Sequence, residues 1–495
     1  MKKRVDIPDK ERAIVLQGGG SLGAYGAWVY SRLYESLSKT DAQEGNKGKP
    51  IFDIIAGTSI GAINAAVLVS YVVENQTYEG SAERLIDFWN YLSKESIVET
   101  NPFFKSWWDF WHKINRDVAS GEAARRYYSA AEFAIHGVPS VFYPHGPTYD
   151  NKFFDVNNIW YRFSNEPLKR SLERFAKFPI ATTKEDDQPR LLLVAVDVAD
   201  GIPITFDSYP KKNGTRKTEY DRFLSHNGKE IGFEHVIHYD KGITSDHVIA
   251  SGSFPVNFDF AKIEVETCGA ASSDRSINLE DTVSKDGNSY NYTKEIRYFW
   301  DGGLMSNTPL MQLVLLHRDY WWKVRGLKDA VPRLGICVIN LHPKKQAEIP
   351  IDRDSVINRN NDMIFSDRVY QEEAMLLLAS DYIDLVRALM KVAEEHGVKK
   401  DIINNLLDQK TRYHGKFIKP GRFLDIVEGR FQIDEIIQVN RKNDEHTISN
   451  KIFDFSLETI KVLFEQGYND ALEGFKEYIE SKEEQPTESI EDRQL

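Results

Sequence analysis

Residues 52–61 read FDIIAGTSIG and decide the fold of this 495-residue chain. Their apolar beginning ends in the pattern Gly57-x-Ser59-x-Gly61, and an Ala-rich apolar stretch starts at Ala62. This order predicts a buried strand, a sharp turn and a buried helix, with the serine hydroxyl exposed at the turn. Backbone N–H groups at the start of that helix would favour negative charge beside the hydroxyl. The alternative role for the serine is a helix N-cap, which needs no flanking glycines.

The same order of elements occurs upstream of this turn. Residues 12–17 (RAIVLQ) form an apolar run that stops at Gly18, Gly19 and Gly20, and apolar residues then recur every four positions from Tyr25. Two strand–turn–helix units in succession predict an α/β fold with a parallel sheet. The other candidate strands, which bring the sheet to about six strands, are residues 191–198, 202–206, 298–300 and 334–341.

The chain length predicts one large domain with additions. We expect residues 1–345 to form the α/β domain, with an aromatic-rich insertion at about 101–190. The pattern changes after residue 345, so residues 346–482 are predicted to be a mostly helical C-terminal extension. Residues 483–495 are acidic and nearly free of large apolar groups, which predicts a disordered tail.

The formal charge of the chain is -12, with 63 basic against 75 acidic side chains. This balance argues against broad attraction to nucleic acid or to an anionic bilayer, so any membrane contact should be transient, local and apolar. The first residues lack the apolar stretch of a signal peptide, and the longest apolar run, 62–73, is too short to span a bilayer. We therefore expect a cytoplasmic protein, at most peripheral to membranes. The two cysteines, Cys268 and Cys337, have no metal-binding or redox spacing.

The glycine turn at residues 18–23 supports two interpretations. Its unblocked amides would surround an oxyanion, as a nucleophilic serine requires. Gly18-x-Gly20-x-x-Gly23 also fits the dinucleotide-binding fingerprint, so a Rossmann-type nucleotide-binding oxidoreductase is the main alternative. That fingerprint requires an acidic residue at the end of the next strand, where this chain has the serine turn instead. A hydrolase uses both turns, since neighbouring parallel strands deliver them to one edge of the sheet.

A nucleophilic serine also needs a base, and Asp301-Gly302-Gly303 follows an aromatic apolar run. Burial beside those aromatic side chains would raise the pKa of the aspartate from its reference value near 3.9 and make it a better base. A Ser-His-Asp esterase is a second alternative, because His342 follows a predicted strand and could reach the same edge. His317 suits this role less, since it is expected on a helix surface.

The glycine turn, the serine turn and the Asp-Gly-Gly motif at 301–303, in this order, resemble the motifs of the patatin-like phospholipases and their bacterial relatives. The stretches that also agree are residues 194–197 (VAVD), 249–255 (IASGSFP) and 301–309. This likeness covers about residues 12–343. A looser likeness extends to residues 364–368 and 453–456, which resemble the C-terminal extension of one bacterial branch of the family.

The resemblance implies a three-layer α/β/α fold with a largely helical extension, and a Ser-Asp dyad that hydrolyses acyl esters of phospholipids, lysophospholipids or related lipids. Ser59 would be the nucleophile and Asp301 the general base, without metal or cofactor. The oxyanion-hole residues implied are Gly18, Gly19, Gly20 and Gly23, and the supporting glycines are Gly57, Gly61, Gly302 and Gly303. Many members have Arg or Lys where this chain has Leu22, so acyl-ester hydrolysis is better supported than a phospholipid substrate. The resemblance leaves head group, acyl-chain length and oligomeric state open.

Overall fold

The computed structural model describes residues 7–484 apart from 44, 46–49, 97–99, 101, 103–105, 107–120, 146–160, 227–228, 269–291, 347, 367–368, 412–421 and 444–445. Most of the aromatic start of the predicted insertion lies outside the described residues. The predicted disordered tail also lies outside them, from residue 485 onward.

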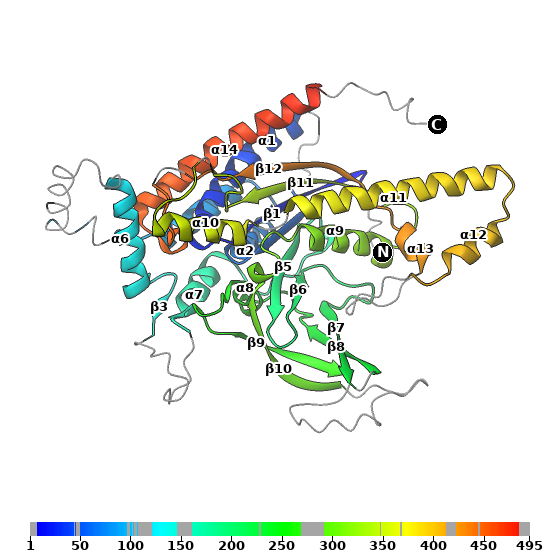
Figure 1. The fold of residues 1–495 in the computed structure, drawn as a ribbon, viewed down its shortest axis with the longest axis horizontal. Helices are drawn as coiled ribbons and strands as arrows, with labels where there is room; N and C mark the ends of the chain where they lie inside the picture. Colours follow the sequence, from blue (N-terminus) through cyan, green and yellow to red (C-terminus); the bar gives the residue numbers. More distant parts are fainter. Residues whose placement is uncertain are drawn as a thin grey trace.

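Ten of the described strands form one mixed sheet in the order β12-β11-β1-β2-β5-β10-β9-β8-β7, with β6 also paired to β5 (Figure 1). The strands from β12 to β5 are parallel, and the others are antiparallel to their neighbours. In sheet order they comprise Ile433–Asn440, Arg333–Asn340, Lys10–Leu16, Ile54–Thr58, Arg190–Asp197, Tyr292–Asp301, Ala261–Cys268, Lys229–His238 and Lys217–His226, and β6 comprises Ile202–Asp207. The sheet is larger than the six strands expected, because β7, β8, β9 and β12 were not among those six.

Helices cover both faces of the parallel strands, and β1 shows why. Its Ile14 and Leu16 point into one hydrophobic core, and its Ala13 and Val15 point into the other, as the alternation of side chains along a strand requires. The first core is covered by α1 (Gly23–Gln43), α2 (Ile60–Asn75), α3 (Ser81–Leu92), α7 (Glu166–Phe175), α8 (Ser245–Gly252) and α14 (Leu457–Glu484). The second core is covered by α9 (Leu310–Asp319) and α11 (Val369–Glu395). This three-layer α/β/α arrangement confirms the predicted fold class.

Smaller elements complete the described structure. The remaining helices and turns of helix are η1 (Gly20–Leu22), α6 (Gly121–His136), η2 (Lys184–Asp186), η4 (Gly302–Leu304), η5 (Tyr320–Val324), α10 (Arg353–Phe365), α12 (Lys400–Leu407), α13 (Phe423–Val427) and η6 (Lys451–Phe453). A separate pair of short strands joins β3 (Tyr143–Pro144) to β4 (Phe163–Ser164). Among the described helices, none has both the length and the apolar character needed to cross a membrane.

The region after residue 345 is mostly helical, as predicted, and it is joined closely to the α/β part. Its one described strand, β12, pairs in parallel with β11 and so belongs to the central sheet. Its last helix, α14, packs on α1, and η6 packs on η1. The extension therefore reaches the glycine turn that opens α1.

Candidate active site

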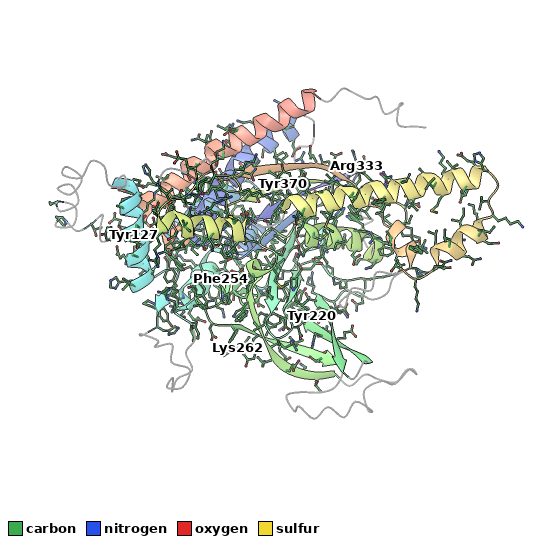
Figure 2. The ribbon with its side chains drawn as sticks, in the orientation of Figure 1. Tyr127, Tyr220, Phe254, Lys262, Arg333 and Tyr370 are labelled. Carbon is green, nitrogen blue, oxygen red and sulfur yellow. The ribbon has the colours of Figure 1, made fainter. Side chains whose placement is uncertain are left out.

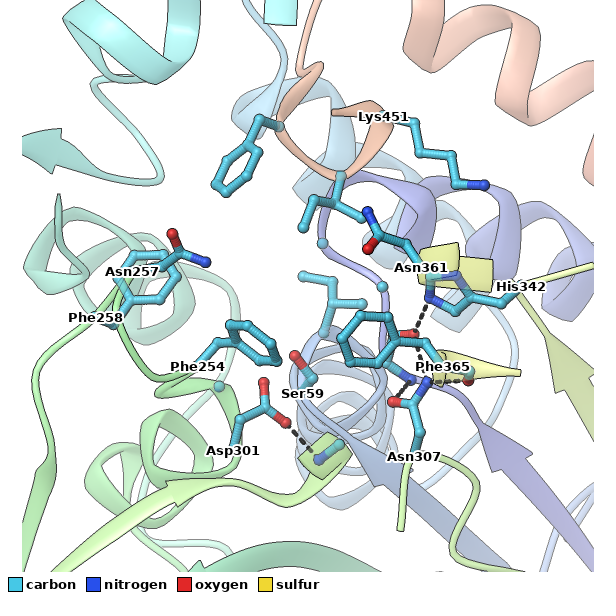
Figure 3. A pocket seen from close by; sticks show the side chains of 18 of the residues that line it. Ser59, Phe254, Asn257, Phe258, Asp301, Asn307, His342, Asn361, Phe365 and Lys451 are labelled. Atoms are coloured by element: carbon cyan, nitrogen blue, oxygen red, sulfur yellow. Dashed lines mark hydrogen bonds between the residues drawn. The ribbon is translucent and has the colours of Figure 1, made fainter. Parts of the chain in front are cut away.

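Ser59 lies at the junction of β2 and α2 in a backbone conformation that few non-glycine residues adopt. Its φ is 56° and its ψ is -126°, which is the geometry of a sharp strand-to-helix turn. Although Ser59 occupies the N-cap position of α2, its hydroxyl makes no capping hydrogen bond. Its N–H donates to the Ser251 hydroxyl at 3.0 Å, and that hydroxyl donates to the Val194 carbonyl at 2.6 Å. These bonds hold the turn while the Ser59 hydroxyl faces a cavity (Figure 3).

The glycines on either side of Ser59 permit close backbone contacts. A Cβ atom on Gly57 would lie 2.3 Å from the carbonyl oxygen of Gly61, and a Cβ on Gly61 would lie 2.1 Å from that of Leu16. Neither distance is possible for a real side chain, so larger residues would push β2, α2 and β1 apart. The glycine after the aspartate behaves similarly, since a Cβ on Gly302 would lie 2.4 Å from a carbonyl oxygen of β5.

Asp301 lies at the end of β10, on the other side of β5 from Ser59. Thr58 in β2 pairs with Val194, and Asp301 pairs with Ala195. Ser59 and Asp301 are therefore at one level of the sheet, and their backbones lie two strand spacings, or about 10 Å, apart across it. Both side chains line the same cavity, and Figure 3 shows the hydroxyl and the carboxylate beside each other.

The Asp301 carboxyl is buried with neutral neighbours. Burial raises its pKa from 3.8 to about 7, and the Ser59 hydroxyl and the Gly303 N–H oppose this shift. The Gly303 N–H donates to Oδ1 of Asp301 at 2.7 Å. In the part of the chain that the structure describes, no cation contributes to the pKa of this carboxyl. A pKa near neutrality is what a general base working at neutral pH needs.

The glycine turn lies directly against the serine turn. A Cβ on Gly18 would be 2.8 Å from the Cβ of Ser59. The N–H of Gly18 is already used, because it donates to Asn307 at 3.2 Å to Oδ1 and 3.4 Å to the backbone carbonyl. Gly19 and Gly20 also line the cavity, and no acceptor for their N–H groups lies within hydrogen-bonding distance among the described residues. Within the glycine turn, the amides of Gly19 and Gly20 are therefore available to a ligand in the cavity.

Gly23, which the resemblance assigned to the oxyanion hole, lies away from the cavity. Its N–H donates to the Gly20 carbonyl inside the turn. A Cβ on Gly23 would meet side-chain atoms of Ile60 and Trp89 at 2.6 Å, so this glycine allows α1 to pack closely. The structure therefore does not bring Gly23 to the cavity wall with Gly18, Gly19 and Gly20. Leu22 is 1% exposed and belongs to the same core, so its side chain does not reach the cavity.

His342 holds the glycine turn rather than the serine. Its Nε2 lies 3.2 Å from the carbonyl oxygen of Gly18, and its Nδ1 lies 3.2 Å from Oδ1 of Asp362. Asp362 also accepts a hydrogen bond of 2.5 Å from Nζ of Lys451. Both ring nitrogens face acceptor oxygens, and among the described residues no hydrogen bond joins either of them to Ser59.

The cavity has a volume of about 380 Å³ and a mostly apolar wall. Its apolar lining residues are Ile60, Ile63, Val141, Phe142, Leu168, Phe254, Phe258, Ile364, Phe365, Ile452, Phe453 and Phe455. The last five come from α10 and from the segment around η6, so the extension supplies one wall. Such a size and lining suit an acyl chain. Within the described residues, no group of three or more His, Cys, Asp or Glu side chains is arranged to hold a metal ion.

Several residues of the site were not singled out from the sequence. Ser251 and Asn307 fall in stretches that had been noted only for their family likeness, so their hydrogen bonds to the two turns are new information. Asp362 and Lys451 gave no signal, because their importance lies in contacts with each other and with His342 across long sequence separations.

The fold is α/β/α, and a serine turn opens into an apolar cavity at the carboxyl ends of its parallel strands. The sequence profile of the patatin-like phospholipases matches residues 14–314, and the chain belongs to this family. Among solved structures, the chain is similar to the crystal structure of VipD from Legionella pneumophila, with 11% identity, coverage of 95% of this chain and 67% of that chain, and a TM-score of 0.28. No curated protein matches the chain.

Proposed function

We propose that the chain hydrolyses acyl esters of phospholipids, lysophospholipids or related lipids, with Ser59 as nucleophile and Asp301 as general base. The observation that carries the proposal is the register of β2 and β10 on β5, which puts the two side chains at one level in one apolar cavity. Membership of the patatin-like phospholipase family supports lipid acyl hydrolysis in general.

In the acylation step, Asp301 accepts the proton of the Ser59 hydroxyl while Oγ attacks the carbonyl carbon of the ester. A bond forms between Oγ and that carbon, and the carbonyl oxygen takes up the negative charge. The N–H groups of Gly19 and Gly20 are the proposed donors to this oxyanion. The carbon–oxygen bond of the ester then breaks, Asp301 returns the proton to the departing alkoxide, and the alcohol leaves.

In the deacylation step, Asp301 takes a proton from a water molecule that attacks the acyl-enzyme. The fatty acid is released when the bond to Oγ breaks, and the proton passes from Asp301 to Ser59. A carboxyl group with a pKa of about 7 can both accept and donate this proton at neutral pH. The acyl chain meanwhile lies against the aromatic wall that includes Phe254 and Phe453.

The proposal is tested with a fluorophosphonate probe and a series of p-nitrophenyl esters of increasing chain length. Ser59→Ala should abolish labelling, and Asp301→Asn should lower turnover by roughly 10² to 10⁴-fold. His342→Gln serves as the control for the histidine alternative, and it should keep its labelling. Undiminished labelling of Ser59→Ala, or complete loss of turnover in His342→Gln with full activity in Asp301→Asn, would contradict the dyad.

A further inference from the structure

One face of α11 carries a row of large apolar side chains that nothing in the described chain covers. The row consists of Met375, Leu378, Tyr382, Leu385, Leu389 and Val392, and between 49% and 61% of each side chain is exposed. The opposite side of α11 packs on the rest of the chain through the buried residues Val369, Leu376 and Ile383. These three residues and the exposed row are about 130° apart around the helix axis. Figure 1 shows the C-terminal half of α11 and α12 extending beyond the end of the sheet, and Figure 2 shows their side chains around the helix.

The spacing within this row is that of a coiled coil. Its members alternate steps of three and four residues, which are the a and d positions of a heptad repeat. A row with this 3.5-residue period is the pattern that packs against another helix in a coiled coil. The polar Gln371 and His396 occupy the next positions of the repeat and end the seam. We call these six residues the α11 seam.

The flanks of the α11 seam disfavour a bilayer as its partner. The exposed acidic residues Asp381 and Glu395 lie at g positions, whereas helices that rest on membranes carry Lys and Arg beside their apolar face. The remaining flanking positions are small or apolar, including Ala374 and Ala388. Small flanks allow another helix to approach closely.

We propose that the α11 seam binds the α11 seam of a second copy of the chain, as an antiparallel coiled coil that makes a homodimer. A two-fold axis between Tyr382 and Leu385 puts these two side chains opposite each other across the pair. The same axis puts Met375 opposite Val392 and Leu378 opposite Leu389, so each a position meets a d position of the second copy. The seam is thus complementary to itself.

The charges and the area also fit this pairing. In the antiparallel register Asp381 faces Ala388 of the second copy and Glu395 faces Ala374, so no like charges meet. The seam spans 18 residues, or about 27 Å of helix. If each side chain offers about 200 Å² when fully exposed, the exposed fractions correspond to at most roughly 670 Å² per copy and about 1,340 Å² for the pair, near the lower end for a specific interface.

The test measures mass in solution by sedimentation velocity from about 0.1 to about 100 μM protein. The full chain should be a dimer at the upper concentrations, and Leu385→Glu combined with Leu389→Glu should weaken dimerisation at least about 100-fold. Leu377→Glu is the matched control, since Leu377 is 42% exposed on the same helix but lies outside the α11 seam. All variants should hydrolyse a small soluble ester equally, which shows that they are folded.

Cysteine cross-linking tests the orientation. Copies with Leu378→Cys, mixed with copies with Leu389→Cys, should form a disulfide-linked mixed dimer on oxidation, whereas a parallel coiled coil would link Leu385→Cys to itself. A wild-type chain that stays monomeric throughout, or a Leu377→Glu variant that dissociates like the seam variant, would overturn the proposal. Binding of monomeric wild type, but not of the seam variant, to phosphatidylserine vesicles would overturn it in favour of a membrane surface.

Discussion

Replacing Asp301 by Asn should remove most of the activity and at the same time stabilise the fold above neutral pH. Burial raises the pKa of this carboxyl from 3.8 to about 7. A difference of about 3 pKa units corresponds to roughly 4 kcal/mol of unfavourable free energy for the ionised carboxylate in the folded chain. The amide of Asn removes the charge but keeps an oxygen that can accept the Gly303 N–H.

The pH dependence of the effect follows from the sign of the shift. Because the folded-state pKa lies above the unfolded value, the stability linked to this group is fully present below about pH 4 and is lost as the pH rises through about 7. The stabilising effect of Asp301→Asn should therefore grow by roughly 2 to 3 kcal/mol between about pH 5 and about pH 8. Denaturant unfolding at both pH values measures it. In the wild type, kcat/KM for a soluble ester should fall about tenfold per pH unit below about 7.

Asp197→Asn is the matched control, because Asp197 is also buried but is paired with Arg297. Two hydrogen bonds of 2.6 and 2.9 Å join them. Removing that charge takes one carboxylate partner from the buried guanidinium, which keeps Asp200 and Glu295. The loss should cost roughly 1 to 3 kcal/mol at both pH values. If Asp301→Asn destabilised the chain in the same way at both pH values, Asp301 would be a structural residue and the reasoning about its pKa would be refuted.

Three further changes test other parts of the site. Gly61→Ala should destabilise the fold by several kcal/mol, because the new Cβ would lie 2.1 Å from a backbone oxygen. Gly26→Ala on α1 is the control. No atom would lie closer than 3.8 Å to its Cβ, so it should be neutral or stabilising by about 0.5 to 1 kcal/mol, and thermal unfolding compares the two variants. Phe453→Ala enlarges the cavity, so the ratio of kcat/KM for long over short acyl esters should rise about three- to tenfold. Asp362→Asn should lower kcat about tenfold without moving the pH midpoint near 7, because Asp362 contacts His342, which lies against the Gly18 carbonyl, and has no contact with Ser59. A shifted midpoint would contradict this.

The strand–turn–helix units could be predicted because their signals are local. β2 and the last four residues of β1 are apolar runs buried on both sides, and each run leads into the glycines that a sharp turn requires. In the antiparallel half, β6 and the end of β10 were predicted, whereas β7, β8 and β9 were missed for the opposite reason. In β9 only alternate residues such as Ile263 and Val265 are buried, so its sequence lacks the continuous apolar run typical of a central strand.

Contacts between distant residues were beyond the reach of sequence patterns. His317 was expected on a helix surface, and that prediction is wrong. The side chain is fully buried, with Nε2 2.8 Å from the Pro332 carbonyl oxygen and Nδ1 3.2 Å from a carboxylate oxygen of Glu11. The partner Glu11 lies on β1, and only the folded sheet brings it beside α9. The same limit applies to the contact between Asp362 and His342, which are also brought together only by the fold.

Two buried aspartates show how the surroundings of a carboxyl decide whether it can be a base. Asp207 and Asp301 are 3% and 2% exposed, so burial raises the pKa of both. Arg190 outweighs this effect at Asp207, where it donates two hydrogen bonds of 2.9 and 2.6 Å, and the pKa ends below its usual value. At Asp301 only the Ser59 hydroxyl and a backbone N–H oppose burial, and the pKa reaches about 7. A guanidinium beside Asp301 would leave a carboxylate too weak to take the serine proton, so the proposed dyad dispenses with a histidine because its carboxyl is buried among neutral groups.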